Sequence, residues 1–249
     1  MITIPNNISP NQLENYYSSL ASDVESSKEE IKHLKEMLSS YAKKLDLTQE
    51  NCLSNIGYPT LTDLEGKAAD TAEKIKDHLD FFDTLKHFDA PEMNAQKEKI
   101  HSNIEQILNC NSQNQGQIQM MKNIIFKVQE LNLFLNRKNK EANGVAQELA
   151  LFAEICATVG PNLQTDYREH MCLKLTEFDQ LTSETAKIIE NLSLQFQQSD
   201  IPEMMMRYNE WRVNSQSHVD SISEKNTKNR ERIEMILQKI LGWCQQVEL

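Results

Sequence analysis

The chain has very few residues that form turns, and few aromatic ones. Its 249 residues include six glycines and six prolines, and Phe, Trp and Tyr together make up 6%. Such a composition cannot separate many short elements, so it predicts a few long helices. A hydrophobic fraction of 39% and a charged fraction of 25% argue against a disordered chain.

Sequence signatures of catalysis are also missing. The chain has no GxSxG, no glycine-rich phosphate loop and no cysteine in a recognisable catalytic context. Its five cysteines are widely spaced and form no CxxC pair, which is typical of reduced thiols in the cytoplasm or nucleus. We therefore predict no enzyme activity, no catalytic residue, no cofactor and no metal.

Targeting and membrane segments are not expected either. The first ten residues, MITIPNNISP, have neither the basic start nor the apolar run of a signal peptide. No segment approaches the ~20 apolar residues that a membrane-spanning helix needs.

The charge is strongly acidic, with a net value of −11 and a pI near 5.1. This sign disfavours direct binding to nucleic acid or to an anionic membrane surface. Two local basic clusters stand out, at Asn136–Lys140 and Lys225–Arg232. Each can contact an acidic partner, although a solvated helix face is the favoured interpretation.

Apolar residues spaced alternately by four and three dominate the first segment and predict a helix over about 10–54. Ser9 is a candidate N-cap, Pro10 fits the first helical position, and Gln12 completes a capping box. The break at Asn55–Pro59 ends this helix, and a second helix is predicted over about 60–88. The first register comprises Leu13, Tyr17, Leu20, Val24, Ser27, Ile31, Leu34, Leu38, Tyr41, Leu45, Thr48 and Cys52.

Two nearly identical stretches, DAPEM at Asp89–Met93 and DIPEM at Asp200–Met204, mark further helix starts. In each, an acidic residue can cap free amides, a proline fits the first turn, and a glutamate follows. An internal duplication is the alternative, and it is disfavoured because the flanking residues show little identity.

One register persists from about 91 to 158 and predicts a long central coiled-coil helix. Asn111 and Asn114 occupy seam positions of this helix, where buried amides can set register and partner choice. The polar run Asn109–Gln117 leaves a loop or hinge at Gly116 as the competing interpretation. After a turn at Thr158–Asn162, helices are predicted over about 163–198 and 201–248, the last with Asn226 and Asn229 on its seam.

Candidate partner-binding residues lie in the last helix. Met204–Met206 and His218 suggest a soft-metal site, but consecutive helical residues point about 100° apart and cannot converge on one ion. Packing, or an adaptable partner surface, is the better interpretation. Core packing is favoured for the large aromatics, with docking as the alternative. The candidate docking residues are Met204, Met205, Tyr208, Trp211, Ile236, Ile240, Trp243 and Val247.

We therefore predict an all-α, elongated coiled coil or helical bundle of about five long helices, largely antiparallel. Its parts would be a flexible N-terminus (1–9), an N-terminal helical hairpin (10–90), the central helix (91–158) and a C-terminal hairpin (162–249).

The polar seam positions suggest that partner helices complete the core. The predicted function is that of a non-enzymatic scaffold subunit in a hetero-oligomeric coiled-coil complex, cytoskeletal, spindle, centrosomal or tethering, in the cytoplasm or nucleus. The expected partners are other coiled-coil subunits. Two alternatives stay open: a BAR-like membrane-binding helical dimer, and a helical enzyme or effector with an unrecognised site.

Overall fold

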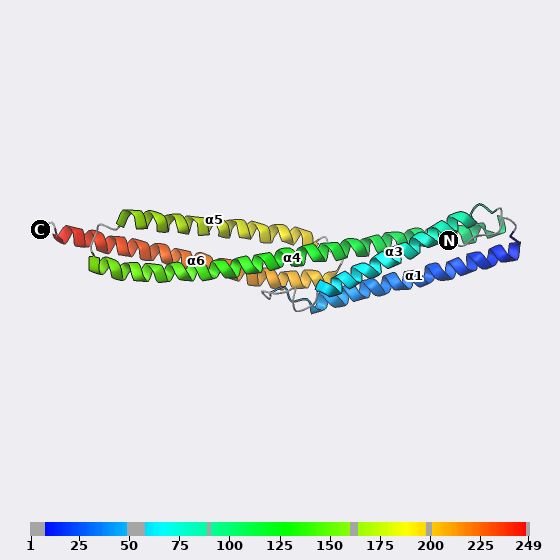
Figure 1. The fold of residues 1–249 in the computed structure, drawn as a ribbon, viewed down its shortest axis with the longest axis horizontal. Coiled ribbons are helices and arrows are strands. Elements are labelled where there is room, and N and C mark those ends of the chain that lie inside the picture. Colours follow the sequence, from blue (N-terminus) through cyan, green and yellow to red (C-terminus); the bar gives the residue numbers. More distant parts are fainter. Residues whose placement is uncertain (1–7, 49–57, 89–90, 160–163, 198–200, 248–249) are drawn as a thin grey trace. The chain divides into compact units, whose positions relative to one another are not determined.

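The computed structural model describes residues 8–48, 58–88, 91–159, 164–197 and 201–247. Within these ranges the chain forms five α-helices and one short 3-10 helix, and no strand, which confirms the predicted all-α fold (Figure 1). The elements are α1 (Pro10–Lys44), α3 (Tyr58–Leu85), η1 (Pro91–Met93), α4 (Asn94–Val159), α5 (Gln164–Gln197) and α6 (Pro202–Val247).

The helices group into two compact units, and each unit is assembled from separated stretches of the chain. Unit 1 comprises Met1–Leu45, Leu53–Ile124 and Ser199–Met204. Unit 2 comprises Asp46–Cys52, Ile125–Gln198 and Met205–Leu249. Helix α4 contributes its first part to unit 1 and the remainder to unit 2.

The first helix begins as predicted but ends earlier. Ser9 Oγ accepts a hydrogen bond from the Gln12 amide, and Gln12 Oε1 accepts one from the Ser9 amide, which completes the capping box. The helix ends at Lys44 rather than near residue 54, because Leu45 adopts an extended conformation. Asp46 Oδ1 then accepts from the Thr48 amide at 3.0 Å, forming an Asx turn that competes with further helix.

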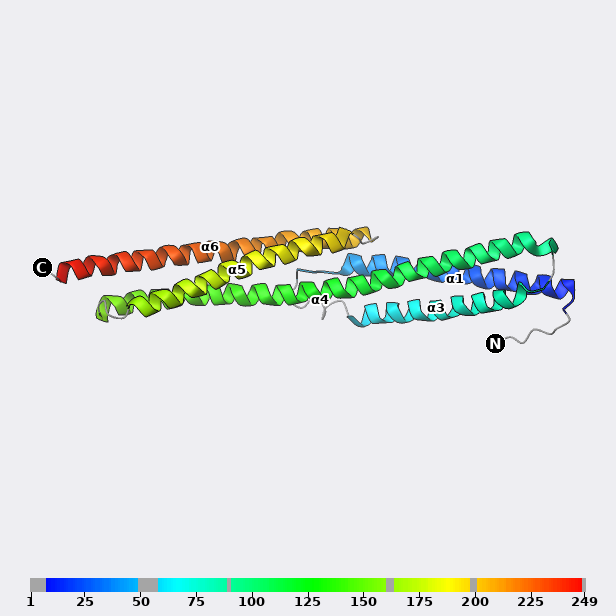
Figure 2. The ribbon, with the colours of Figure 1, turned by 90° about the horizontal axis from the view of Figure 1, so that it is seen from above.

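Unit 1 packs α1, α3 and the first part of α4 side by side, as both views show (Figures 1 and 2). Helix α3 runs opposite to the other two. Two contacts between α3 and α4 show these opposite directions. Phe82, late in α3, lies against His101, early in α4, whereas Ala68, earlier in α3, contacts Asn111, later in α4. The core is lined by Leu13, Tyr17, Leu20, Val24, Ile31, Ile75, Phe82, Leu85, Met93, Ile100, Ile104 and Ile107.

Unit 2 repeats this arrangement with the rest of α4, α5 and α6. Helix α6 runs parallel to α4, since Asn132 meets Trp211 and Asn139 meets Lys225. Helix α5 runs in the opposite direction (Figure 2). The buried apolar residues of this unit include Ile125, Val128, Leu135, Ala142, Val145, Leu149, Ile189, Leu192, Tyr208, Val219 and Ile222.

The polar run Asn109–Gln117 is helical, so the loop or hinge interpretation at Gly116 is wrong. Helix α4 continues through this run without interruption. Asn111 and Asn114 are buried and bond to neighbouring helices. These cross-helix bonds engage the Nδ2 groups of both asparagines inside a continuous helix.

Helices begin at both echoed stretches, as predicted. At the first, Pro91–Met93 forms a 3-10 turn that leads into α4 at Asn94, three residues later than predicted. At the second, α6 begins at Pro202, and the Met204 amide donates to the Ile201 carbonyl at 3.0 Å. The capping roles assigned to Asp89 and Asp200 lie outside the described residues.

Candidate docking surface

Three of the residues predicted to bind a partner are buried within the chain. Met204, Tyr208 and Trp211 are at most 1% exposed. Tyr208 donates its hydroxyl proton to the Ile189 carbonyl at 2.9 Å, and the Trp211 indole donates to Asn132 Oδ1 at 2.8 Å. The structure therefore uses these side chains as core, which was the favoured interpretation for the large aromatics, and they present no exposed docking surface.

Of the other predicted docking residues, two are half-buried and three have side chains outside the described residues. Met205 and Ile236 are half-buried. Ile240, Trp243 and Val247 lie in α6, but their side chains fall outside the described residues, so docking at the end of α6 stays a prediction. The methionine run does not converge: Met204 is buried, Met205 half-buried and Met206 exposed. Among the described residues, no group of three or more His, Cys, Asp or Glu side chains has the arrangement of a metal site.

The seam asparagines of unit 1 bond to main-chain carbonyls of neighbouring helices. Asn111 Nδ2 donates to the Ala68 carbonyl at 2.9 Å, and Asn114 Nδ2 donates to the Ile31 carbonyl at 3.2 Å. The two amides therefore connect α4 to α3 and to α1. Because a one-residue slip would break both bonds, they are placed to fix the register of the three helices.

Polar residues on the seam of unit 2 also form hydrogen bonds between helices. Asn226 Nδ2 donates to Asp179 Oδ1 at 3.1 Å, and Asn229 Nδ2 donates to the Ala142 carbonyl at 3.4 Å. Lys225 donates to Asn139 Oδ1. These polar seam positions thus form hydrogen bonds inside the chain, while the buried Oδ1 atoms of Asn111 and Asn226 have no hydrogen-bond partner among the described residues.

A titratable group also lies on the seam of unit 1. His78 Nε2 lies 2.9 Å from the hydroxyl of Ser27, which is buried on α1. Burial lowers the pKa of His78, and the nearby Lys74 acts in the same direction, while Asp23, Asp77 and Glu30 oppose the shift.

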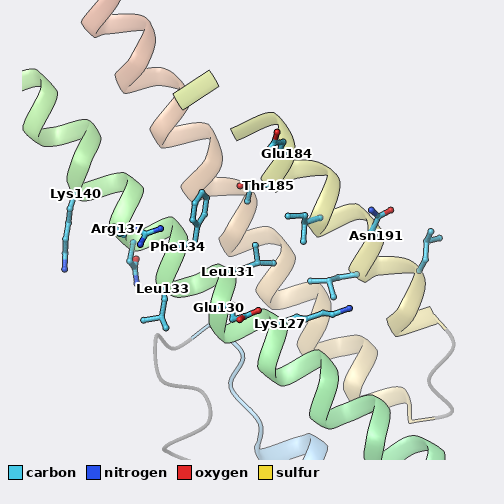
Figure 3. Close-up of a pocket in the computed structure, with 14 residues that line it drawn as sticks. Lys127, Glu130, Leu131, Leu133, Phe134, Arg137, Lys140, Glu184, Thr185 and Asn191 are labelled. Carbon is cyan, nitrogen blue, oxygen red and sulfur yellow. The ribbon is translucent and has the colours of Figure 1, made fainter. Parts of the chain in front are cut away.

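An open groove lies between α4 and α5 in unit 2, with a volume of about 1350 Å³ (Figure 3). Leu131 and Phe134 extend from α4 toward α5, and Thr185 extends from α5 toward α4. Three further apolar residues line the groove and remain substantially exposed: Leu133 at 44%, Ile188 at 43% and Leu194 at 57%. Large side chains gathered in this way on a protein surface are typical of an interaction site.

Charged side chains surround this apolar floor. Lys127, Arg137 and Lys140 line the α4 side together with Glu130, and Glu184 lines the α5 side. The Arg137 guanidinium and the Lys138 ammonium lie 5.8 and 5.9 Å from the centre of the Phe134 ring, within cation–π range. The basic cluster Asn136–Lys140, for which a solvated face was favoured, therefore lies at an apolar groove.

The groove was missed because its apolar residues are divided between two helices. On α4, a second set of residues with alternating spacing of four and three could have shown one wall from sequence alone. This stripe is exposed along its length. It comprises Glu130, Leu133, Arg137 and Lys140, which line the groove, and begins with Phe126, which is not one of the lining residues. The α5 wall could not be anticipated, since sequence does not show which helices become neighbours.

Comparison with protein-family models, curated protein sequences and solved structures gives no significant match to this chain. Within the described residues, none of the helices has the length and apolar content needed to cross a membrane.

Proposed function

We propose that this chain is a non-enzymatic scaffold subunit of a hetero-oligomeric helical complex and that it presents docking surfaces to other helical proteins. Cytoskeletal, spindle, centrosomal and tethering complexes, in the cytoplasm or nucleus, are the settings in which such subunits commonly act. The proposal concerns the mode of action, which is to hold helical partners at set positions.

The observation that carries the proposal is the exposed apolar groove of unit 2. The polar seams described above find hydrogen-bond partners within the chain, which supports two helical units that maintain their own packing. Leu133, Ile188 and Leu194, in contrast, expose apolar surface on one face of unit 2. Burying such surface contributes roughly 25 cal/mol per Å², so a second protein that covers the groove gains binding free energy.

The two alternatives gain no support of this kind. A BAR-like dimer would use a dense basic face on an anionic membrane, whereas the chain has a net charge of −11. An enzyme would need converging reactive groups, and the sequence contains none of the catalytic motifs considered above.

Isolation of the chain from native extract tests the proposal. The chain should co-purify with at least one other helical protein in near-stoichiometric amount, identified by mass spectrometry. The same preparation should be repeated with Ile188→Glu/Leu194→Glu, which is expected to lose the partner that covers the groove. Recovery of the unaltered chain alone, as a monodisperse monomer, would contradict the scaffold proposal.

A further inference from the structure

The α4–α5 groove has the chemistry to select one kind of occupant. We infer that it binds an amphipathic α-helix of another protein, with an apolar stripe seated between α4 and α5 and an acidic flank facing α4. This inference rests on the proposed function and specifies the chemistry of one partner.

The spacing of the α4 wall indicates a helical occupant. Glu130, Leu133, Arg137 and Lys140 all line the groove and follow one another at alternating steps of three and four. Residues at this spacing form a straight stripe along a helix, which is the surface on which a second helix packs. The stripe is separate from the buried seam of α4, which contains Val128, Asn132 and Leu135. Helix α4 can therefore pack within unit 2 and still accept another helix.

Helix α5 forms the second wall of the groove. Ile188 of α5 is 43% exposed, Leu192 of α5 is buried, and both face the groove. A helix lying between the two walls can place residues at i, i+3, i+4 and i+7 against Leu133, Phe134 and Ile188. This is the helix-in-groove mode of recognition.

The local charge indicates an acidic flank. Residues 126–141 contain four cations, Lys127, Arg137, Lys138 and Lys140, and two carboxylates, Glu130 and Glu141, of which Glu141 pairs with Arg137 and Lys138. This basic segment contrasts with the net charge of −11 for the whole chain. Since charges are screened beyond about 8 Å at physiological ionic strength, the local cations determine which flank is favoured there. The α5 wall contributes Glu184 instead, so the acidic flank belongs on the α4 side.

Charge and shape disfavour two other occupants. A second copy packed symmetrically on this groove would set the basic segment of one molecule against that of the other, and like charges repel. A flat lipid surface would not fill a groove of about 1350 Å³. Both occupants are distinguished in the experiment below.

The test uses the full chain and a pair of labelled three-heptad helical peptides. Both peptides carry Leu at positions a and d and Gln on one flank. The other flank carries Glu in the first peptide and Lys in the second. Fluorescence anisotropy should show that the Glu peptide binds about tenfold or more tightly than the Lys peptide, and that this preference weakens as salt is raised.

Variants then assign the binding to the groove. Lys127→Glu/Arg137→Glu/Lys140→Glu should lower affinity for the Glu peptide by about tenfold or more. Lys28→Glu/Lys32→Glu/Lys35→Glu, which makes the same change in net charge on exposed positions of α1, should leave affinity within about twofold. Leu133→Glu should weaken binding, whereas Leu151→Glu, also exposed on α4, should not. Unchanged circular dichroism melting curves would show that each variant remains folded.

Several results would overturn the inference. Equal affinity for the two peptides would contradict the acidic flank, and the absence of binding would contradict a helical occupant. A dimer that dissociates in the Leu194→Glu variant, seen by sedimentation velocity, would assign the groove to a second copy. Co-sedimentation with vesicles of phosphatidylserine and phosphatidylcholine, lost in the Lys127→Glu/Arg137→Glu/Lys140→Glu variant, would assign it to a membrane. If a helical protein co-purifies from extract irrespective of the groove variants, the scaffold proposal stands and this inference fails.

Discussion

The indole of Trp211 and the side-chain amide of Asn132 form a buried hydrogen bond, in which Nε1 donates to Oδ1 at 2.8 Å. The same asparagine donates from Nδ2 to the Leu47 carbonyl at 2.8 Å. The Asn132 side chain therefore links α4 to α6 and to the segment around Leu47 that follows α1, all within unit 2. A group with a bonded oxygen and a bonded nitrogen at a buried position is costly to disturb.

Trp211→Phe should destabilise the protein by about 1–3 kcal/mol, because it removes the buried hydrogen bond from the indole N–H to Asn132 Oδ1. Chemical denaturation followed by circular dichroism measures the change. Asn143→Ala, at an exposed position of α4, serves as the control and should stay within about 0.5 kcal/mol of the unaltered chain. A Trp211→Phe effect as small as that of the control would mean that the hydrogen bond contributes little.

Asn111 allows a comparison of two substitutions at one buried site. Asn111→Leu should be close to neutral, since it removes a polar group whose Oδ1 has no hydrogen-bond partner among the described residues. Asn111→Asp should destabilise by about 3 kcal/mol at pH 7, because it buries a carboxylate against the Ala68 carbonyl. Thermal melting distinguishes them, and the Asp variant should recover as the pH is lowered. Equal stability of the two variants at pH 7 would refute this account.

His78 should make unit 1 sensitive to mild acid. Burial holds the pKa of His78 below its ordinary value of 6.5, so the unfolded chain binds a proton more readily than the folded chain. The stability that depends on this residue is complete above pH 6.5 and falls as the pH drops toward the lower folded-state pKa. Melting temperatures should therefore decrease less between about pH 8 and pH 5.5 in His78→Gln than in the unaltered chain. Identical pH profiles would exclude this role.

Glu203, in the second echoed stretch, should contribute more than Glu92 in the first. Hydrogen bonds from Ser39, from its own backbone amide and from Lys43 lower the pKa of Glu203 below its usual value of 4.5. Its contribution is therefore present above pH 4.5 and is lost as the pH falls through the folded-state pKa. Glu203→Gln should cost about 1 kcal/mol at pH 7, and the difference should shrink as the pH falls below 4.5.

Glu92→Gln is the matched control, because Glu92 follows Pro91 as Glu203 follows Pro202 but is exposed. It should change stability by less than about 0.5 kcal/mol in the same melting experiment. If the two variants lose equal stability, the two echoed stretches act alike and the contacts of Glu203 are unimportant.

The sequence predicted which polar positions lie on the buried seams, but it did not predict which groups form hydrogen bonds with them. The alternating spacing placed Ser27, Asn111 and Asn114 at seam positions, and all three are buried. Sequence does not show which helices face each other, so it could not reveal that His78 and the Ala68 carbonyl bond to them. Because the sequence does not identify these bonding partners, the polar seam positions suggested that a partner helix completes the core.

Other differences between the prediction and the structure have causes that are visible in the local sequence but did not decide the prediction. Asp46 followed by Thr48 is an Asx-turn signal that ends α1, yet the apolar spacing continues to Cys52 and suggested a longer helix. Trp211 was considered both as core and as a docking residue, because an aromatic side chain on a seam has the same sequence pattern in either role. Only the position of Asn132 decides between them.

The interleaving of the two units has a consequence for the order in which the protein is made. Ser199–Met204, the last stretch of unit 1, is synthesised after residues 125–198 of unit 2. Unit 1 therefore lacks its buried Ile201 and Met204 until most of the other unit has left the ribosome. A premature stop after residue 198 would accordingly damage both units, and neither can be expressed intact as one continuous fragment.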